Sequence, residues 1–486
     1  MELSKASTRS RFFALALGLG IAALFAAQLT ALLNHRLDYP LIDDWRYYRD
    51  AFAMPAELSL EWLFAPARDT LHLSGKLLDW LVLRWVRHDY AVLAAASFVL
   101  AFGGWLVAAV GACLAASRGM PGVRNAALLT FALPLAACPY FVTAGPLQKL
   151  EPAIAYHQML PVLGLSALAW MALSRRDLSD VSLALAVLVT FFFGLTYSSG
   201  AVALFLFGAT LLLLTWLRRG HPESQAFALA LGVSAAATIS LVLHVAIPAA
   251  VHGANPVVEA RTYEMTSPFE WKYWDFLFAL FDRAVLSTAT GTIPRLRGVT
   301  VALAVTAPFA GLAALLLRGR LDPETARRAL PLLATFVAII GYAALVSYGR
   351  ADFGRRYLPP HDLEARPSLY AHNRFFFWWI TASLPGVVVA WGLFVTRVAT
   401  ARTARIVVWS LAVLALLPKP AADDGSYLDH WRYAAAYRED ARRVETQVER
   451  NRHNARRRQE SAVAAGEGAT FVERWGLDVH EPGALR

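Results

Sequence analysis

Long apolar stretches separated by short polar segments recur along the whole chain. A helix needs about 20 mostly apolar residues to cross the hydrocarbon of a bilayer, so the pattern predicts about eleven membrane-spanning helices. We expect them at residues 12–33, 90–116, 125–143, 153–173, 181–195, 200–217, 225–249, 296–317, 330–347, 375–395 and 406–417. The fifth, sixth and last are short, and the count falls by one if one of them is re-entrant. The expected fold is an all-α polytopic membrane protein.

Composition supports this class. Hydrophobic residues make up 57% of the 486 positions, and the mean hydropathy is +0.43. The first apolar stretch is long and is not followed by a small-residue cleavage site, so we interpret it as a retained helix and not as a signal peptide. Cys113 and Cys138 both fall in predicted spans, where we expect two free thiols and neither a disulfide nor a zinc site.

The distribution of charge predicts an orientation. With the N-terminus in the cytoplasm, the short cytoplasmic segments are residues 1–11, 117–124, 174–180, 218–224, 318–330 and 397–405. Their excess of Lys and Arg over Asp and Glu equals the whole formal net charge of +10. This is the positive-inside pattern, so the basic pI reports topology and gives no reason to expect a nucleic-acid partner. The Ala- and Arg-rich, Lys-poor composition favours a bacterial inner membrane.

The other side of the membrane carries the long loops, at residues 34–89, 250–295 and 348–374. The polar tail 418–486 is expected on that side as well, and on the cytoplasmic side if the number of spans differs by one. Residues 1–417 then form one membrane domain. Trp-rich stretches with apolar residues at helical spacing predict interfacial helices within these loops, at residues 61–64, 71–81 and 267–285.

Paired carboxylates open the first outer loop. Asp43 and Asp44 follow the first span by about ten residues, at the depth of a lipid head group, where ionisable residues are commonly functional. His72 and Lys76 are four residues apart in the same loop and share one helix face. Together these residues would suit a phosphosugar: the carboxylates would face a hydroxyl of the sugar or the acceptor, and the cations would face the phosphate. The alternatives are that the acid pair caps a helix beginning near Trp45, and that His72 is an ordinary interfacial histidine.

Further polar residues collect at the same surface. Arg350 and Arg366 lie in an outer loop against the positive-inside expectation, and an anionic ligand would explain them. The alternative for Arg350 is an arginine at a helix end whose charged group reaches the interface. At the outer end of the fourth span, His157 and Gln158 are candidates to line a cavity, although an interfacial aromatic belt with a hydrogen-bonded histidine is the simpler interpretation. For His244, inside the seventh span, we favour a hydrogen-bonded contact between helices.

Three short segments resemble a known family. They are residues 39–48 (YPLIDDWRYY), 71–78 (LHLSGKLL), and 348–354 with 368–370 (YGRADFG and SLY). The first is similar to the acidic signature of the first extracytoplasmic loop in GT-C-type integral membrane glycosyltransferases. The others resemble the His-containing interfacial helix and the late outer loop of bacterial multi-span members. Leu369 stands where those members commonly have an arginine, and Leu73 stands where they usually have a basic residue.

The resemblance implies a GT-C-like fold and transfer of a sugar from a polyprenyl-phosphate donor to a lipid, glycan or protein acceptor on the outer face. It implies Asp43 as the general base or acceptor-orienting carboxylate, supported by Asp44. The donor phosphate would be held by Arg350, Arg366, Lys76 and His72. Trp45, Tyr48, His157, Gln158 and Tyr370 would line the substrate site. No cofactor is certain, and a divalent cation such as Mg²⁺ or Mn²⁺ on the acid pair is an open possibility.

Two other functions stay open at this point. A transporter or flippase for a lipid-linked glycan would use the polar groups as a path, but it should carry charges at mid-membrane and on both sides of the cavity. The candidate ionisable residues lie at one interface only. An oligosaccharide polymerase or ligase would depend on the arginine-rich outer loop more than on Asp43.

Overall fold

The computed structural model describes nine helices and the residues that adjoin them. The longest described stretches are residues 60–65, 71–85, 152–174, 178–217, 224–252, 265–286, 295–351 and 389–395, with scattered helical positions in 19–33, 92–103 and 386–397. Within these residues every element is an α-helix and there is no strand, which confirms the predicted fold class for this part of the chain. The predicted spans at 125–143 and 406–417 and the tail 418–486 lie outside the described residues.

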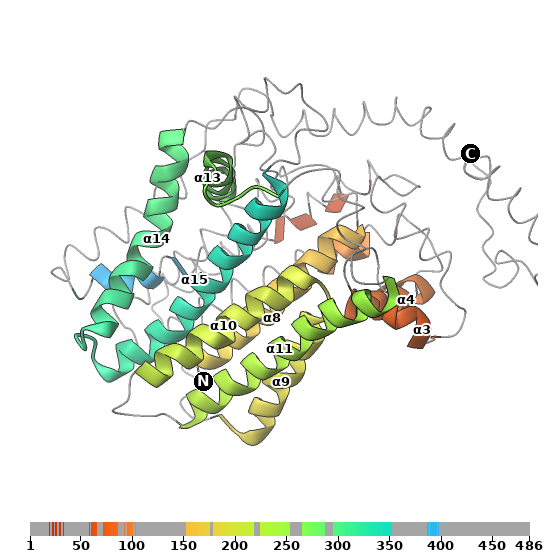
Figure 1. The fold of residues 1–486 in the computed structure, drawn as a ribbon, viewed down its shortest axis with the longest axis horizontal. Helices are drawn as coiled ribbons and strands as arrows, with labels where there is room; N and C mark the ends of the chain where they lie inside the picture. Colours follow the sequence, from red (N-terminus) through yellow and green to blue (C-terminus); the bar gives the residue numbers. More distant parts are fainter. Residues whose placement is uncertain are drawn as a thin grey trace, which may run out of the picture.

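The helices follow one another in the order shown in Figure 1. Their bounds are α3 Leu60–Phe64, α4 Leu73–Trp85, α8 Pro152–Ser174, α9 Asp180–Gly194, α10 Ser198–Leu217, α11 Ser224–His252, α13 Trp271–Leu286, α14 Arg295–Leu317 and α15 Pro323–Arg350. Apart from the start of α15, each begins and ends within a few residues of a predicted span or interfacial helix.

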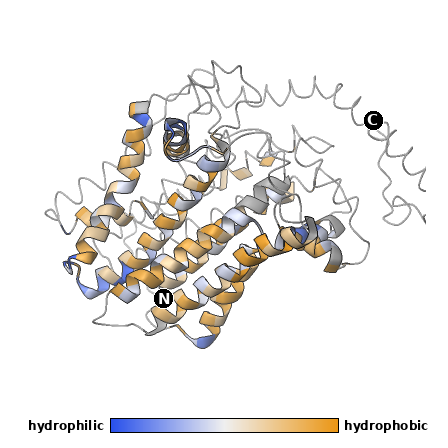
Figure 2. Ribbon diagram, viewed as in Figure 1, coloured by the Kyte–Doolittle hydropathy of each residue, from blue (hydrophilic) through white to orange (hydrophobic). Residues whose placement is uncertain are grey.

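Four of the described helices, α10, α11, α14 and α15, are long and apolar enough to cross a membrane, while α8 and α9 carry shorter apolar segments. Their apolar residues run along the full length of each helix, and polar residues gather at the ends (Figure 2). Such a group of helices indicates a membrane-embedded protein.

The start of α15 corrects the sequence prediction. Residues 318–330 were expected as a loop, but the helix already begins at Pro323. Asp322 caps it by accepting a hydrogen bond from the Thr325 backbone N–H at 3.0 Å, and proline at the first helical position has the right φ in advance. Hydropathy marks only the apolar part of a helix, so it missed this polar first turn.

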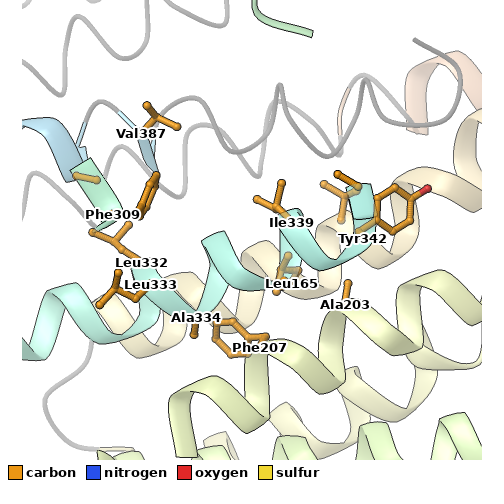
Figure 3. Close-up of a cluster of buried hydrophobic side chains, with 14 of the residues drawn as sticks. Leu165, Ala203, Phe207, Phe309, Leu332, Leu333, Ala334, Ile339, Tyr342 and Val387 are labelled. Carbon is orange, nitrogen blue, oxygen red and sulfur yellow. The ribbon is translucent and has the colours of Figure 1, made fainter. Parts of the chain in front are cut away.

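The core forms around α10, which packs against α11, α15, α8 and α9. Figure 3 shows Phe207 of α10 between side chains of α15 and α8, among them Ala334 and Leu165. Packing between apolar helices in a membrane depends on close fit, and small residues permit it. At Gly208 of α10, a Cβ atom would lie only 2.8 Å from the backbone nitrogen of Ser234 on α11. The two backbones therefore approach closely there.

The helix group has two distinct ends. At one end, α9 turns into α10, and α4 docks on this turn through a hydrogen bond from the Ser74 N–H to the Leu195 carbonyl at 3.3 Å. At the other end, α14 turns into α15, and Arg327 Nη1 donates to the Leu173 carbonyl of α8 at 3.4 Å. We refer to these as the α4 end and the α14–α15 end.

Candidate functional site

The structure places the predicted site residues unevenly. His72 and Lys76 are described in full on or beside α4. The backbones of His157, Gln158 and Arg350 are described, the first two in α8 and the last as the final residue of α15. The other predicted site residues lie outside the described residues, namely Asp43, Asp44, Trp45, Tyr48, Arg366 and Tyr370. Their assigned roles remain predictions.

The first contact of the candidate site is made by Ser74, in the first turn of α4. Its side chain is fully buried, and its Oγ donates to the Phe192 carbonyl at 2.6 Å. Together with the bond from its backbone N–H to Leu195, this residue satisfies two carbonyls at the end of α9. Because the last carbonyls of a helix have no partner inside the helix, they are natural acceptors for a docking residue.

His72 makes the second contact to the same turn. Its Nδ1 lies 3.1 Å from the Thr196 carbonyl oxygen, and since a carbonyl only accepts, Nδ1 carries the hydrogen. The imidazole also packs edge-on against the Tyr197 ring, with centroids 5.1 Å apart. The side chain is 5% exposed. His72 is therefore a buried docking residue of α4.

Lys76 connects α4 to α3. Its ammonium group donates to the Trp62 carbonyl at 2.9 Å and to the Ala65 carbonyl at 2.6 Å, and it lies 5.1 Å from the centroid of the Trp62 ring. These carbonyls belong to the end of α3, where a cation is favoured by the helix dipole. The residue is 8% exposed. A buried ammonium with this geometry fixes the path of the chain between α3 and α4.

A second histidine reaches the α9–α10 turn, from α11. His244 of α11 donates from Nε2 to the Gly194 carbonyl at 2.8 Å, which confirms the interpretation of this residue as a hydrogen-bonded contact between helices. Its Nδ1 is buried without a partner in the described part of the chain. With Ser74 and His72, it completes a set of side chains that bind the turn.

This turn is the structural centre of the site. Gly194 ends α9, Leu195 and Thr196 follow it in a non-helical turn, and all three are buried. Buried backbone carbonyls away from water are costly unless they accept hydrogen bonds. Carbonyls of Phe192, Gly194, Leu195 and Thr196 accept from Ser74, His244 and His72. The α9–α10 turn is thus a fixed platform on which the helix after the acidic loop is docked.

The end of α15 contributes a second element. Arg350 ends this helix, and two residues earlier the Tyr348 carbonyl accepts from the Thr266 backbone N–H at 3.0 Å. That bond ties the segment before α13 to the end of α15. Because α15 begins at the α14–α15 end of the helix group, its last residue lies toward the opposite end, where α4 is docked (Figure 1).

The α14–α15 end has different chemistry. Glu324 pairs with Arg327 at 3.0 Å and with Arg328 at 2.8 Å, and Arg397 pairs with Asp322. Burial alone would raise the pKa of the Asp322 carboxyl, but hydrogen bonds from Thr325 and the positive charge of Arg397 outweigh it, and the pKa is lowered. This network is electrostatic: the carboxylates of Asp322 and Glu324 are partly exposed, whereas the Arg328 side chain is buried.

No protein-family model and no curated protein matches the chain. Chemical assignments therefore depend on its own residues and their geometry. In the described part of the chain, no group of three His, Cys, Asp or Glu residues is arranged to hold a metal ion. Asp43 and Asp44 lie outside that part, so a divalent cation on the acid pair remains a prediction.

Sequence reasoning singled out His72 and Lys76. It missed Ser74 and the α9–α10 turn, to which Ser74, His72 and His244 bind. Apolar stretches at 181–195 and 200–217 signalled a break between two helices. Nothing in their composition indicated that α4 would dock there, because the acceptors are backbone carbonyls. Gly194 followed by Thr196 and two serines was the only local signal of a helix end and a new start.

Proposed function

We propose that this protein is an integral membrane glycosyltransferase of the GT-C type. It transfers a sugar from a polyprenyl-phosphate donor to a lipid, glycan or protein acceptor. The observation that supports the proposal best is the docking of α4 on the buried α9–α10 turn. The loop that carries Asp43 and Asp44 runs from the first predicted span to this fixed helix, so its far end has a defined position at the edge of the helix group.

In the proposed reaction, the Asp43 carboxylate takes the proton from the acceptor hydroxyl as that oxygen attacks the anomeric carbon of the sugar. The bond between this carbon and the phosphate oxygen breaks, and the polyprenyl phosphate leaves with the electron pair. Arg350 and Arg366 stabilise the negative charge on the departing phosphate, since guanidinium groups make bidentate contacts to phosphate. Asp44 supports Asp43 or helps hold a divalent cation.

The buried contacts of His72 and Lys76 refine their proposed roles. Both side chains bind backbone carbonyls of neighbouring segments, so they would act on the donor phosphate indirectly, by fixing the loop. We keep Trp45, Tyr48, Tyr370, His157 and Gln158 as candidates for contacts with the sugar and the acceptor. Aromatic rings and amides are common partners of sugar faces and hydroxyls.

For the setting, we propose a bacterial inner membrane with a cytoplasmic N-terminus, about eleven spans and the site on the outer face. Basic residues of the described chain support this orientation. Arg318, Arg320, Arg327 and Arg328 all gather at the α14–α15 end, opposite α4. The polar tail 418–486 is assigned to the outer side by the same alternation of spans.

The test is transfer by purified membranes offered a panel of polyprenyl-phosphate sugars, comparing wild type, Asp43→Asn and Asp50→Asn. Loss of a general base should reduce turnover about 100-fold or more, whereas Asp50→Asn, a control in the same loop, should retain activity. Full transfer by Asp43→Asn would refute the catalytic assignment. Absence of transfer from every donor in the wild type would refute the proposed activity.

Arg350 is tested in the same assay. We expect Arg350→Ala to lose most of the transfer activity and Arg350→Lys to recover part of it, because lysine keeps the charge without the bidentate geometry. Undiminished transfer by Arg350→Ala would leave the enzyme in place and remove the phosphate role of this residue.

A further inference from the structure

Exposed aromatic side chains occupy two levels in the described part of the helix group. Near the α14–α15 end they are Trp170, Trp216 and Phe227; near the opposite end of the spans they are Phe269, Trp271, Trp274 and Tyr348, with Phe64 and Trp85 on α3 and α4. Each of the first three lies within a few residues of a helix terminus. Exposed aliphatic side chains fill the length between the two levels, among them Leu188, Leu231, Ile239 and Leu303.

The lengths of the helices that run between the two levels match a bilayer. At 1.5 Å per residue, α10 advances about 27 Å from Ser198 to Trp216, close to the ~30 Å of a hydrocarbon core. Along α15, the distance from Pro323 to Tyr348 is about 38 Å, close to the ~40 Å of a bilayer that includes its head groups. Tryptophan and tyrosine concentrate at these boundaries because their rings have an apolar body and a polar edge.

Three of the exposed aromatic residues at the α4 end lie on helix α13 or just before it. In Figure 1 this helix is seen end-on while α14 and α15 are seen from the side, so α13 runs across the direction of the spans. One face, including Tyr273, Phe276 and Leu280, is buried. Trp271 and Trp274 are exposed, and Phe269 just before the helix is 100% exposed. A helix with this division of faces lies in an interface plane.

The position of this helix is fixed by backbone contacts. Thr266 donates from its N–H to the Tyr348 carbonyl, as described above, and Trp274 Nε1 donates to the Pro268 carbonyl at 2.8 Å. Phe269 is therefore held at the level where α15 ends. A fully exposed phenylalanine followed by two exposed tryptophans is unfavourable in water and favourable among lipid head groups.

We propose that Phe269, Trp271 and Trp274 form a lipid-binding surface, which we call the aromatic anchor. It inserts into the head-group region of the leaflet at the α4 end and sets the depth of the whole helix group. Its partner is the phospholipid bilayer and not another protein, because a second aromatic level lies about one bilayer thickness away and aliphatic side chains cover the distance between them. The proposal is independent of glycosyl transfer.

The test measures depth directly with nitroxide spin labels in the full chain, reconstituted in phospholipid nanodiscs. Single cysteines are introduced as Phe269→Cys, Trp216→Cys, Ile239→Cys and Leu303→Cys after Cys113→Ser and Cys138→Ser. Accessibility to oxygen, which enters lipid, is compared with accessibility to a water-soluble nickel chelate. We expect labels at 269 and 216 to report the two interfaces and labels at 239 and 303 to report the hydrocarbon interior.

Two outcomes would overturn the proposal. One is a label at position 269 that is as accessible to the nickel chelate as one at Arg320→Cys in the α14–α15 turn. The other is a label at 269 that is as deep as one at 239. A second measurement requires no label: brominated lipids should quench wild-type tryptophan fluorescence more strongly than that of the Trp271→Phe/Trp274→Phe variant, and equal quenching contradicts the anchor.

Discussion

The two ends of the helix group are held together by different forces. At the α4 end, mostly neutral side chains donate to carbonyls of a buried turn, and Ser74 and His72 are 0% and 5% exposed. At the α14–α15 end, an ion pair joins Asp322 to Arg397, with both side chains partly exposed. Buried hydrogen bonds fix one geometry and are costly to break, whereas exposed ion pairs contribute little and tolerate change. A site that needs fixed distances is better served by the first kind of end.

Among the residues of the α4 end, Lys76 should have the largest effect on stability when it is replaced. Replacement by methionine keeps the length of the side chain but leaves the Trp62 and Ala65 carbonyls without the ammonium. We expect a loss of roughly 3 kcal/mol in the free energy of unfolding, since each buried acceptor left unsatisfied costs about 1–3 kcal/mol. Unfolding in mixed micelles measures it, with Arg320→Met as an exposed control. A loss no greater than that of the control would contradict a docked α3.

His72 should have the next largest effect. We expect His72→Leu to destabilise the protein by roughly 2 kcal/mol, because the Thr196 carbonyl loses its donor inside a buried contact. His72→Asn should recover much of this loss, since its amide nitrogen can take the place of Nδ1. Equal losses in both variants would show that the hydrogen bond is unimportant and that packing on Tyr197 dominates.

Ser74→Ala removes one hydroxyl and leaves the backbone bond to Leu195 in place. The expected loss is roughly 1 kcal/mol, the usual contribution of one hydrogen bond. Hydrogen exchange of α4 should increase in this variant because docking is weakened. Thr300→Ala is the matched control, since its hydroxyl is exposed and bonds only to its own helix. Unchanged exchange in α4 would contradict the contact.

Much of the fold could be predicted from hydropathy alone. The bounds of α8, α10 and α14 agree with the predicted spans to within two residues, because each apolar stretch ends where polar residues begin. The start of α15 could not be found in this way, since its first turn is capped by Asp322 and is charged. Helix periodicity correctly predicted a helix that contains Lys76 after the acid pair, but the prediction that His72 shares it was wrong, because α4 begins one residue later, at Leu73. Their hydrogen-bond partners could not be predicted, because the partners are backbone carbonyls and every residue type has one.

The smallest effect is expected at the α14–α15 end. The lowered pKa of Asp322 means that the folded state favours its ionised form, so its contribution is present above the ordinary pKa of 3.8 and disappears as the pH falls through the lower folded value. We expect Asp322→Asn to cost less than about 1 kcal/mol at neutral pH, given the exposure of the pair. The difference from wild type should vanish in acid and shrink in high salt. A difference that grows in acid would contradict the assignment.

The central claim is that the acid pair and the α4 end face outward while the α14–α15 end faces the cytoplasm. Sided labelling with an impermeant maleimide tests it most directly, using Arg49→Cys and Arg320→Cys in intact and permeabilised cells after removal of Cys113 and Cys138. The account predicts that position 49 reacts in intact cells and that position 320 reacts only after permeabilisation. The reverse pattern would contradict the orientation and, with it, the proposed outer-face transfer.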